Sequence, residues 1–198
     1  RTGRGQHGIE LPPEQERIYL EGVEALMGGP SAALAASYDF GRHRRLLDLG
    51  GGIGAWLAAV LRVHPALQGA LFDLPEAAAL ARQYLARDAA TSRAEVMAGD
   101  FFSDAIPGDH DVVLIANVLH LYGPARNLDI LRRTRGAVAN GARLLLADFW
   151  TNAAHTEPPL AAMIAPSCTM ASTRSAASAA SVIIAPGWPR GIRNPASV

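Results

Sequence analysis

Lysine is missing from the 198-residue sequence, and all 18 of its basic residues are arginine. Together with the abundant alanine, this bias indicates a GC-rich gene and therefore a bacterial source. Cysteine occurs once, at Cys168, which excludes an internal disulfide and is consistent with a reducing cytoplasm. No apolar run approaches the ~18 residues that a membrane-spanning helix requires, and the N-terminus carries no signal-peptide pattern. We therefore expect a cytoplasmic protein.

An excess of charge of either sign is also lacking, because 18 acidic residues balance the 18 arginines. A net charge of zero gives no bulk attraction to nucleic acid or to an anionic membrane, so neither is expected as a partner. No spacing of histidine, cysteine and carboxylate side chains resembles a set of metal ligands. The length and the hydrophobic content of 49% suffice for one domain with a proper core.

Strand-like and helix-like patterns alternate through the middle of the chain. We expect strands at 45–49, 70–73, 94–98, 111–116 and 142–149, separated by helices at 55–63, 75–87 and 125–139. This alternation predicts an α/β fold with a mostly parallel sheet and helices on both faces. Ligands of such sheets bind beyond the carboxyl ends of the strands. The polar residues expected at these ends are Asp48, Asp73, Asp100, Asn117 and Asp148.

The segment before the first strand has a different pattern. Residues 1–12 form a polar lead-in, and apolar residues at helical spacing predict a helix over 13–27. We expect Gly28-Gly29-Pro30 to end this helix and a second short helix to follow near 31–37.

A glycine-rich turn follows the first predicted strand, in the sequence LLDLGGGIG of residues 46–54. Glycine has no Cβ, so it lets a ligand approach the backbone, and the start of a helix behind such a turn suits an adenosine-bearing cofactor. Gly50 and Gly52 with Ala55 also satisfy the looser G-x-G-x-x-A pattern, which on its own fits NAD.

Three acidic positions favour S-adenosylmethionine over a dinucleotide. Asp48 suits the cationic end of a ligand better than a pyrophosphate. Asp73 lies 23 residues after Gly50, where an acid can accept hydrogen bonds from ribose hydroxyls. Asp100, followed by Phe101 and Phe102, offers an acid for an adenine amino group and aromatic faces for the ring. The alternatives are a helix-capping or turn residue for Asp48, a helix N-cap for Asp73 and ordinary core for the phenylalanines.

These motifs occur together in one family. The run 46–54, then Phe72-Asp73-Leu74-Pro75, Gly99-Asp100-Phe101-Phe102 and Asn117-Val118-Leu119-His120, resembles the small-molecule O-methyltransferases of plant and bacterial secondary metabolism. Caffeate, hydroxyindole and anthracycline O-methyltransferases are of this type. The resemblance covers roughly residues 11–165. It implies a Rossmann-like class I methyltransferase fold and transfer of a methyl group from S-adenosylmethionine to a hydroxyl of a small aromatic or polyketide-type acceptor, without a metal.

The resemblance also implies roles for individual residues. His120 matches the catalytic base of the family, and Asp148 lies where the acid that orients this histidine is found, although plant members carry glutamate there. An imidazole, with an ordinary pKa near ~6.5, can act as a general base on a phenol as the nucleophile forms. The alternative for His120 is a structural histidine. The other histidines lack a comparable context and are expected on the surface or in loops: His7, His43, His64, His110 and His155. The cofactor contacts implied are Asp48, Gly50, Gly52, Asp73, Leu74, Asp100, Phe101 and Asn117.

Two parts depart from the family pattern. The family is homodimeric through an N-terminal helical domain, and we expect this sequence to begin after it, with linker and helices at 1–40 and the cofactor-binding catalytic domain at 41–165. Residues 166–198 are rich in Ala, Ser, Pro and Arg and contain no acid. We expect a disordered or aberrant tail there, of the kind that a frameshifted or truncated gene produces. The final strands of the family would then be missing, which would leave the strand at 142–149 as an exposed edge and the chain weakly stable, with little turnover.

Three other functions are compatible with parts of the pattern. The first is an S-adenosylmethionine-binding remnant without catalysis. The second is a hydroxylase or decarboxylase of the same family, in which the cofactor is structural. The third, an NAD-dependent oxidoreductase, is disfavoured by Asp48 and by the segment Gly99–Phe102.

Overall fold

A computed structural model of the chain describes residues 12–151, 154, 156 and 181–185. The α-helices in these ranges are α1 (Pro13–Ser37), α2 (Ala55–Val63), α3 (Pro75–Leu85) and α4 (Pro124–Ala137). The strands are β1 (Arg45–Leu49), β2 (Gln68–Asp73), β3 (Ala94–Ala98), β4 (Val112–Ala116), β5 (Arg143–Asp148) and β6 (Ser181–Ala185). Short 3-10 helices are η2 (Phe40–Arg42), η3 (Ala89–Thr91) and η4 (Leu119–Leu121).

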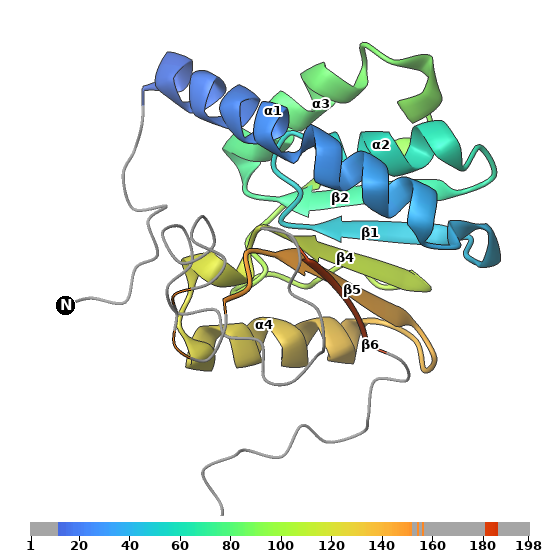
Figure 1. Cartoon of the computed structure of the whole chain (residues 1–198), viewed down its shortest axis with the longest axis vertical. Coiled ribbons are helices and arrows are strands. Elements are labelled where there is room, and N and C mark those ends of the chain that lie inside the picture. Colours follow the sequence, from blue (N-terminus) through green and yellow to red (C-terminus); the bar gives the residue numbers. More distant parts are fainter. Residues whose placement is uncertain (1–11, 152–153, 155, 157–180, 186–198) are drawn as a thin grey trace, which may run out of the picture.

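The strands form one sheet in the order β3-β2-β1-β4-β5-β6 (Figure 1). The first five strands in this order run parallel, and β6 pairs antiparallel with β5. The chain moves outward from β1 to β3 and then returns to place β4 on the other side of β1. Because such crossovers are right-handed, this reversal puts α2 and α3 on one side of the sheet and α4 on the other, as Figure 1 shows. The predicted α/β fold is confirmed.

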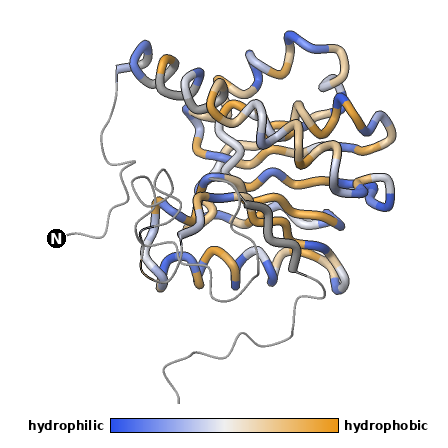
Figure 2. Tube along the Cα trace, viewed as in Figure 1, coloured by the Kyte–Doolittle hydropathy of each residue, from blue (hydrophilic) through white to orange (hydrophobic). Residues whose placement is uncertain are grey.

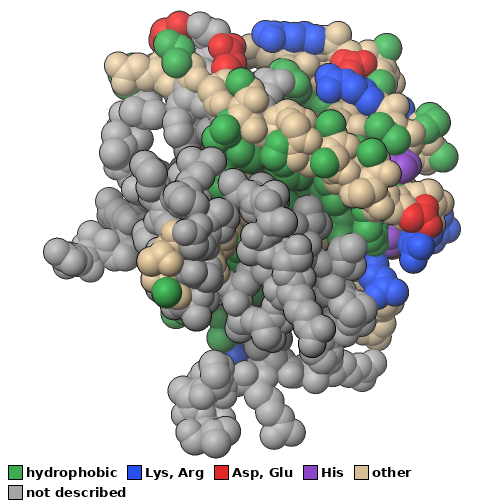
Figure 3. Space-filling view, in the orientation of Figure 1, with side chains coloured by type: hydrophobic (Ala, Val, Ile, Leu, Met, Phe, Trp, Pro, Cys, Tyr) green, Lys and Arg blue, Asp and Glu red, His purple; other side chains and the backbone are tan. Residues whose placement is uncertain are grey.

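The core of the protein surrounds the central strands. Leu46, Leu47, Val113 and Leu114 are fully buried, as expected for parallel strands covered on both faces. Figure 2 shows hydrophobic residues running along the strands, with hydrophilic residues at turns and outer helix surfaces. Among the described residues visible in Figure 3, acidic and basic side chains lie close to one another and to apolar ones. None of the helices in the described part of the chain is both long and apolar enough to span a membrane.

The prediction that Gly28-Gly29-Pro30 ends the first helix is wrong, because α1 continues without interruption to Ser37. A proline within a helix removes one backbone hydrogen bond, and here the Ser31 hydroxyl donates to the Gly28 carbonyl at 3.1 Å. A buried stripe also runs through this point, since Met27, Ser31 and Leu34 are almost fully covered. Packing of this stripe against the rest of the protein therefore outweighs the local helix-breaking signal.

The prediction that β5 forms an exposed edge is also wrong. Strand β6 covers it, with Leu145 opposite Ile184 and Asp148 opposite Ser181. Five residues of the segment expected to be a tail thus belong to the sheet, and the rest of that segment lies outside the described residues. One antiparallel final strand, which we expected to be missing, is therefore present.

The other predicted boundaries are close to the observed ones. Elements 45–49, 55–63 and 94–98 match, and the remaining ends differ by one or two residues. After α4 the chain turns at Gly141, which has φ 89° and has no atom within 4 Å of the place where a Cβ would lie. This turn precedes β5 and therefore lies at the amino-terminal edge of the parallel strands, opposite the edge where ligands bind.

Candidate functional site

The glycine-rich turn between β1 and α2 adopts backbone conformations that favour glycine. Gly50, Gly52 and Gly54 have φ values of 74°, 57° and 89°. The Gly50 N–H donates to the Phe72 carbonyl at 2.8 Å, which ties the turn to β2. A Cβ on Gly50 would lie 2.7 Å from Cγ2 of Val118, so no side chain fits there. The turn therefore presents bare backbone at the start of α2, where a ligand can approach closely.

Asp48 lies beneath this turn and is fully buried. Neither of its carboxylate oxygens has a hydrogen-bond partner among the described residues. Burial raises the pKa of Asp48 to about 7, the charge of Asp73 adds to this effect, and the backbone of Leu57 partly offsets it. A Cβ on Gly51 would lie 2.7 Å from the Asp48 carboxylate, so the carboxyl group supports the turn directly from below.

Asp73, at the end of β2, faces the same turn. Its Oδ2 accepts the Gly52 N–H and its Oδ1 accepts the Leu74 N–H, both at 2.7 Å. Leu74 is the N-cap residue of α3 and no side chain caps that helix, so Asp73 does not act as its N-cap. Leu74 itself is 39% exposed at this end of the sheet. The carboxylate of Asp73 is thus fixed beside the glycine turn.

The loop after β3 places Asp100 next to Asp73. The Gly99 N–H donates to the Asp73 carbonyl at 2.9 Å. Asp100 Oδ1 accepts the Phe102 N–H at 2.8 Å, and its own N–H donates to Asp104 at the same distance. Phe101 is buried beside the glycine turn, with its Cε1 atom 3.5 Å from where a Cβ of Gly50 would lie. Phe101 is therefore positioned both as a core residue and as a wall of the site, and its position agrees with both interpretations.

Tyr122 also lies among these loops, although no role in the site was predicted for it. Its ring packs edge-on against Phe102 at 5.1 Å and Phe101 at 6.1 Å between centroids. Burial raises the pKa of Tyr122 to about 12, and the carboxylates of Asp73 and Asp100 raise it further, while Arg126 opposes them. The ring contacts of Tyr122 place the turn after β4 beside the loop after β3. Its position two residues after His120 was the feature of the sequence that could have placed Tyr122 at the site.

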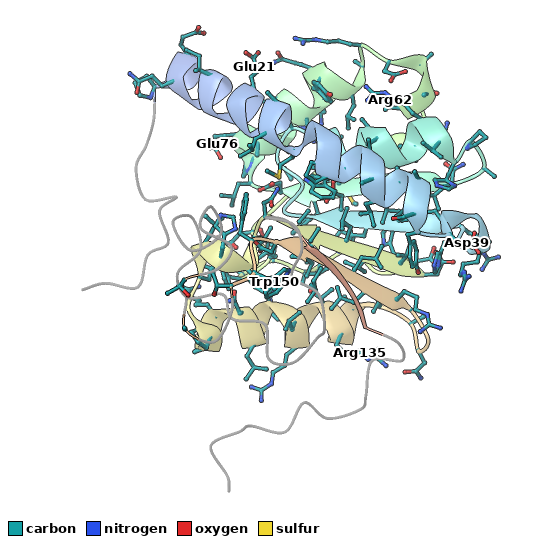
Figure 4. The ribbon with its side chains drawn as sticks, viewed as in Figure 1. Glu21, Asp39, Arg62, Glu76, Arg135 and Trp150 are labelled. Carbon is teal, nitrogen blue, oxygen red and sulfur yellow. The ribbon has the colours of Figure 1, made fainter. Side chains whose placement is uncertain are left out.

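His120 and Asp148 meet as the resemblance implied. Nδ1 of His120, in η4, lies 2.7 Å from Oδ1 of Asp148, at the end of β5. The Asp148 side chain is 1% exposed and that of His120 is 13% exposed. The ring of His120 also packs edge-on against Phe149, at 5.6 Å between centroids. For Nε2 of His120, no hydrogen bond is seen within the described ranges, and the side chain as a whole is partly exposed. Figure 4 shows Trp150, directly after β5, at this same end of the sheet.

Asn117 connects the His120 turn to the sheet. It has a positive φ of 56°, and its N–H donates to the Ala147 carbonyl at 2.8 Å. Its side-chain Oδ1 is buried and has no hydrogen-bond partner among the described residues. The next residue, Val118, is the one that abuts Gly50. Asn117 therefore brings the turn after β4 against the turn after β1.

All the residues predicted for the site thus lie along one edge of the sheet, although they come from five separate segments. Together they offer bare glycine backbone, fixed carboxylates for hydroxyl and amino groups, aromatic walls and a buried acid. This donor and acceptor set fits a positively charged nucleoside. In the described part of the chain, no three His, Cys, Asp or Glu side chains gather as a metal site. A cavity of about 530 Å³ lies elsewhere, between α1, α2 and α3, where Glu21 and Arg62 line it (Figure 4).

Comparisons with known proteins agree with this geometry. A family model described as an O-methyltransferase domain matches residues 8–185. The 3-hydroxy-5-methyl-1-naphthoate 3-O-methyltransferase of Streptomyces sahachiroi is 35% identical over 146 residues, which cover 74% of this chain and 42% of that relative. The 8-amino-8-demethylriboflavin N,N-dimethyltransferase of Streptomyces davaonensis is 42% identical over 114 residues, which cover 57% and 33% respectively.

Solved structures give the same picture. The structure of the S-adenosylmethionine-dependent methyltransferase SibL in its apo form aligns with a TM-score of 0.67 and 35% sequence identity. The alignment covers 74% of this chain and 43% of SibL. The chain thus spans less than half the length of each of these three relatives.

Proposed function

Since this chain belongs to the O-methyltransferase domain family, whose model matches residues 8–185, we propose that it binds S-adenosylmethionine and that its site transfers the methyl group to a hydroxyl of a small aromatic metabolite. The observation that carries the proposal is the His120–Asp148 pair, which lies at the same edge of the sheet as the glycine turn. A nucleotide-binding turn alone suits many reactions, whereas a buried histidine–carboxylate pair beside it suits proton removal.

In this proposal the cofactor is held by the residues that converge on the glycine turn. Asp73 accepts hydrogen bonds from the ribose hydroxyls, and Asp100 accepts one from the adenine amino group. Leu74 and Phe101 cover apolar faces, and the turn with Asn117 contacts the remainder. Asp48 lies beneath the turn, and in its ionised form, above its pKa of about 7, it favours a cationic ligand. S-adenosylmethionine supplies, when bound, a methyl group on a positively charged sulfur.

His120 serves as the general base in this proposal. Its Nδ1 carries the proton that is donated to Asp148, which leaves Nε2 as the acceptor for the hydroxyl proton of the substrate. Asp148 holds the ring in this tautomer and stabilises the imidazolium that forms after proton transfer. The chain's contribution is therefore to position the acceptor oxygen and to remove its proton at Nε2.

The names of the relatives support the acceptor class. One acts on a hydroxynaphthoate, and others are named for puromycin, phenazine and mitomycin chemistry. We propose a hydroxylated aromatic acceptor of this kind. A second candidate is an aromatic amine, favoured by the 42% identity to an N,N-dimethyltransferase. The His120–Asp148 pair favours the hydroxyl, because a phenol must lose its proton as the new bond forms.

Calorimetric titration with S-adenosylmethionine tests the first half of this proposal. We expect the wild-type protein to bind it, and Asp73→Ala to weaken binding by ~10–100-fold because the site then loses a charge-assisted acceptor and the anchor of the turn. Asp129→Ala, which removes an exposed carboxylate on α4, is the matched control and should bind normally. A folded protein that binds no S-adenosylmethionine, or that prefers NAD, would overturn the proposal. Transfer of a labelled methyl group to 3-hydroxy-1-naphthoate or its 3-amino analogue then separates the two acceptor candidates.

A further inference from the structure

Two side chains of α4 bind the backbones of two of the loops at the site. Arg133 donates from Nε to the Phe101 carbonyl at 2.6 Å and from Nη2 to the Asp104 carbonyl at 2.5 Å. Asn127 donates from Nδ2 to the Leu119 carbonyl at 2.9 Å and to the Tyr122 carbonyl at 3.1 Å. The first pair of carbonyls belongs to the Asp100 loop, and the second pair flanks His120.

Arg133 is suited to fix the Asp100 loop. Its planar guanidinium reaches two carbonyls three residues apart, and bonds from an ionised donor are stronger than neutral ones. Within the loop, Asp100 and Asp104 are linked by a further bond at 2.8 Å. A second arginine of α4, Arg126, lies over the ring of Phe102 at 4.3 Å from its centroid. The position of Asp100 is therefore set from the helix.

Asn127 is suited to fix the His120 turn. Both hydrogens of its amide are directed to carbonyls, and this chemistry identifies the atom facing them as nitrogen. Its Oδ1 is buried without a hydrogen-bond partner among the described residues. Asp148 holds the ring of His120, and Asn127 holds the backbone on both sides of it. The ring of His120 and two N–H groups of its turn are thus held from β5, and two carbonyls of the same turn are held from α4.

We propose that Arg133 and Asn127 are positioning residues for opposite halves of the reaction, Arg133 for the cofactor through Asp100 and Asn127 for the acceptor through His120. The inference rests on the proposed function. It implies that substitutions of these two residues affect different quantities, although both residues lie on the same helix. Loss of the Arg133 contacts weakens cofactor binding, whereas loss of the Asn127 contacts slows turnover at saturating cofactor.

Calorimetry with S-adenosylmethionine tests the Arg133 half. We expect Arg133→Met to weaken binding by ~10-fold or more, since the loop that carries Asp100 loses both anchors. Arg133→Lys should restore only part of the affinity, because an ammonium group cannot match the fork geometry. Arg132→Met is the control, because Arg132 is exposed and makes no described contact. Equal affinities of the Arg133→Met and Arg132→Met proteins would overturn this half.

Turnover of 3-hydroxy-1-naphthoate tests the Asn127 half. We expect Asn127→Asp, which turns a carboxylate toward two carbonyls, to lower kcat by ~10–100-fold while cofactor affinity stays within ~3-fold. Ala125→Asp adds the same charge at an exposed position of the same helix and should change neither quantity by more than ~2-fold. A normal kcat in Asn127→Asp, or equal losses of kcat and affinity, would overturn this half.

Amide hydrogen exchange on the ligand-free protein keeps this test independent of the proposed function. Arg133→Met should accelerate exchange over residues 100–104 and leave 119–122 unchanged, and Asn127→Ala should do the reverse. If the wild-type protein binds no S-adenosylmethionine, the proposed function fails while this pattern still decides the positioning roles. Acceleration in both loops of both variants, or in neither, would overturn the inference.

Discussion

Asp148 holds His120 through both its ring and its backbone. The carboxylate lies 2.7 Å from Nδ1 of the ring, and its second oxygen accepts the N–H groups of Leu119 at 2.8 Å and His120 at 3.3 Å. The Phe149 N–H donates to Oδ1 at 2.8 Å. One buried carboxylate thus orients the imidazole of His120 and closes the turn that carries it.

Replacing Asp148 with asparagine should therefore affect turnover far more than cofactor binding. The amide keeps one acceptor oxygen but loses the charge that stabilises a protonated imidazole, so we expect kcat to fall by ~10²–10⁴-fold. Affinity for S-adenosylmethionine should stay within ~3-fold, because none of the Asp148 contacts reaches the glycine turn. Initial rates and calorimetry measure the two quantities, with Asp129→Asn as the charge-matched control. An unchanged kcat would remove His120 from its proposed role.

Gly51→Ala should destabilise the protein, because the new Cβ has no space. It would lie 2.7 Å from the Asp48 carboxylate and 2.8 Å from Cδ1 of Leu71, both fully buried. We expect the free energy of unfolding to fall by ~1–3 kcal/mol, together with a loss of cofactor affinity. The control is Gly136→Ala in α4, where nothing lies within 4 Å of the Cβ position and helix propensity adds up to ~1 kcal/mol. Denaturant titration would contradict the prediction if both variants were as stable as the wild type.

Asp48 should make the protein less stable as pH rises through the acidic range. The unfolded carboxyl ionises near 3.8, whereas the folded one keeps its proton until about 7. The folded state therefore binds more protons between these values, and its stability decreases by up to ~4 kcal/mol over this window. Asp48→Asn lacks this group, so its stability relative to the wild type should rise steadily from pH 4.5 to 7.5. Parallel stability curves for the two proteins would contradict the prediction.

His110 should have the opposite effect. It lies in a loop before β4, which agrees with the expectation of a surface or loop position, and within that loop it is only 3% exposed. Burial lowers its pKa, and the charge of Arg45 adds to the effect. Below pH ~6.5 the unfolded chain takes up a proton that the folded protein resists, so stability falls as pH falls. His110→Gln should remove this acid sensitivity in melting experiments between pH 7 and pH 5. Because the predicted slopes have opposite signs, the Asp48 and His110 variants serve as controls for each other.

The sequence predicted that several polar residues lie at one edge of the sheet. Parallel strands end at one edge of a sheet, so a polar residue at the end of each predicted strand implied that Asp48, Asp73 and Asp100 lie near one another. Strand β1 and helix α2 were predicted at their observed bounds. The glycine turn between them marks where the strand ends and where the helix begins. The His120–Asp148 contact came from the family resemblance, and the structure places the pair within hydrogen-bonding distance.

The features that the sequence did not predict depend on contacts between distant segments. Pro30 was expected to end α1, yet a stripe of buried side chains that forms only against the folded body carries the helix onward. Strand β6 is only five residues long, and its pairing with β5 spans a long stretch of chain. Asn127 and Arg133 bind backbone carbonyls, which every residue possesses, so no sequence pattern identifies their partners.

The turn at Gly141 has a practical consequence. It joins α4 to β5 at the far edge of the sheet, its backbone tolerates no ordinary side chain at φ 89°, and open space surrounds it. A short peptide epitope or a fluorophore-bearing loop inserted between Asn140 and Gly141 would therefore project into solvent. Such a label would report on folding and on ligand binding from the edge of the sheet opposite the Asp100 loop and the His120 turn.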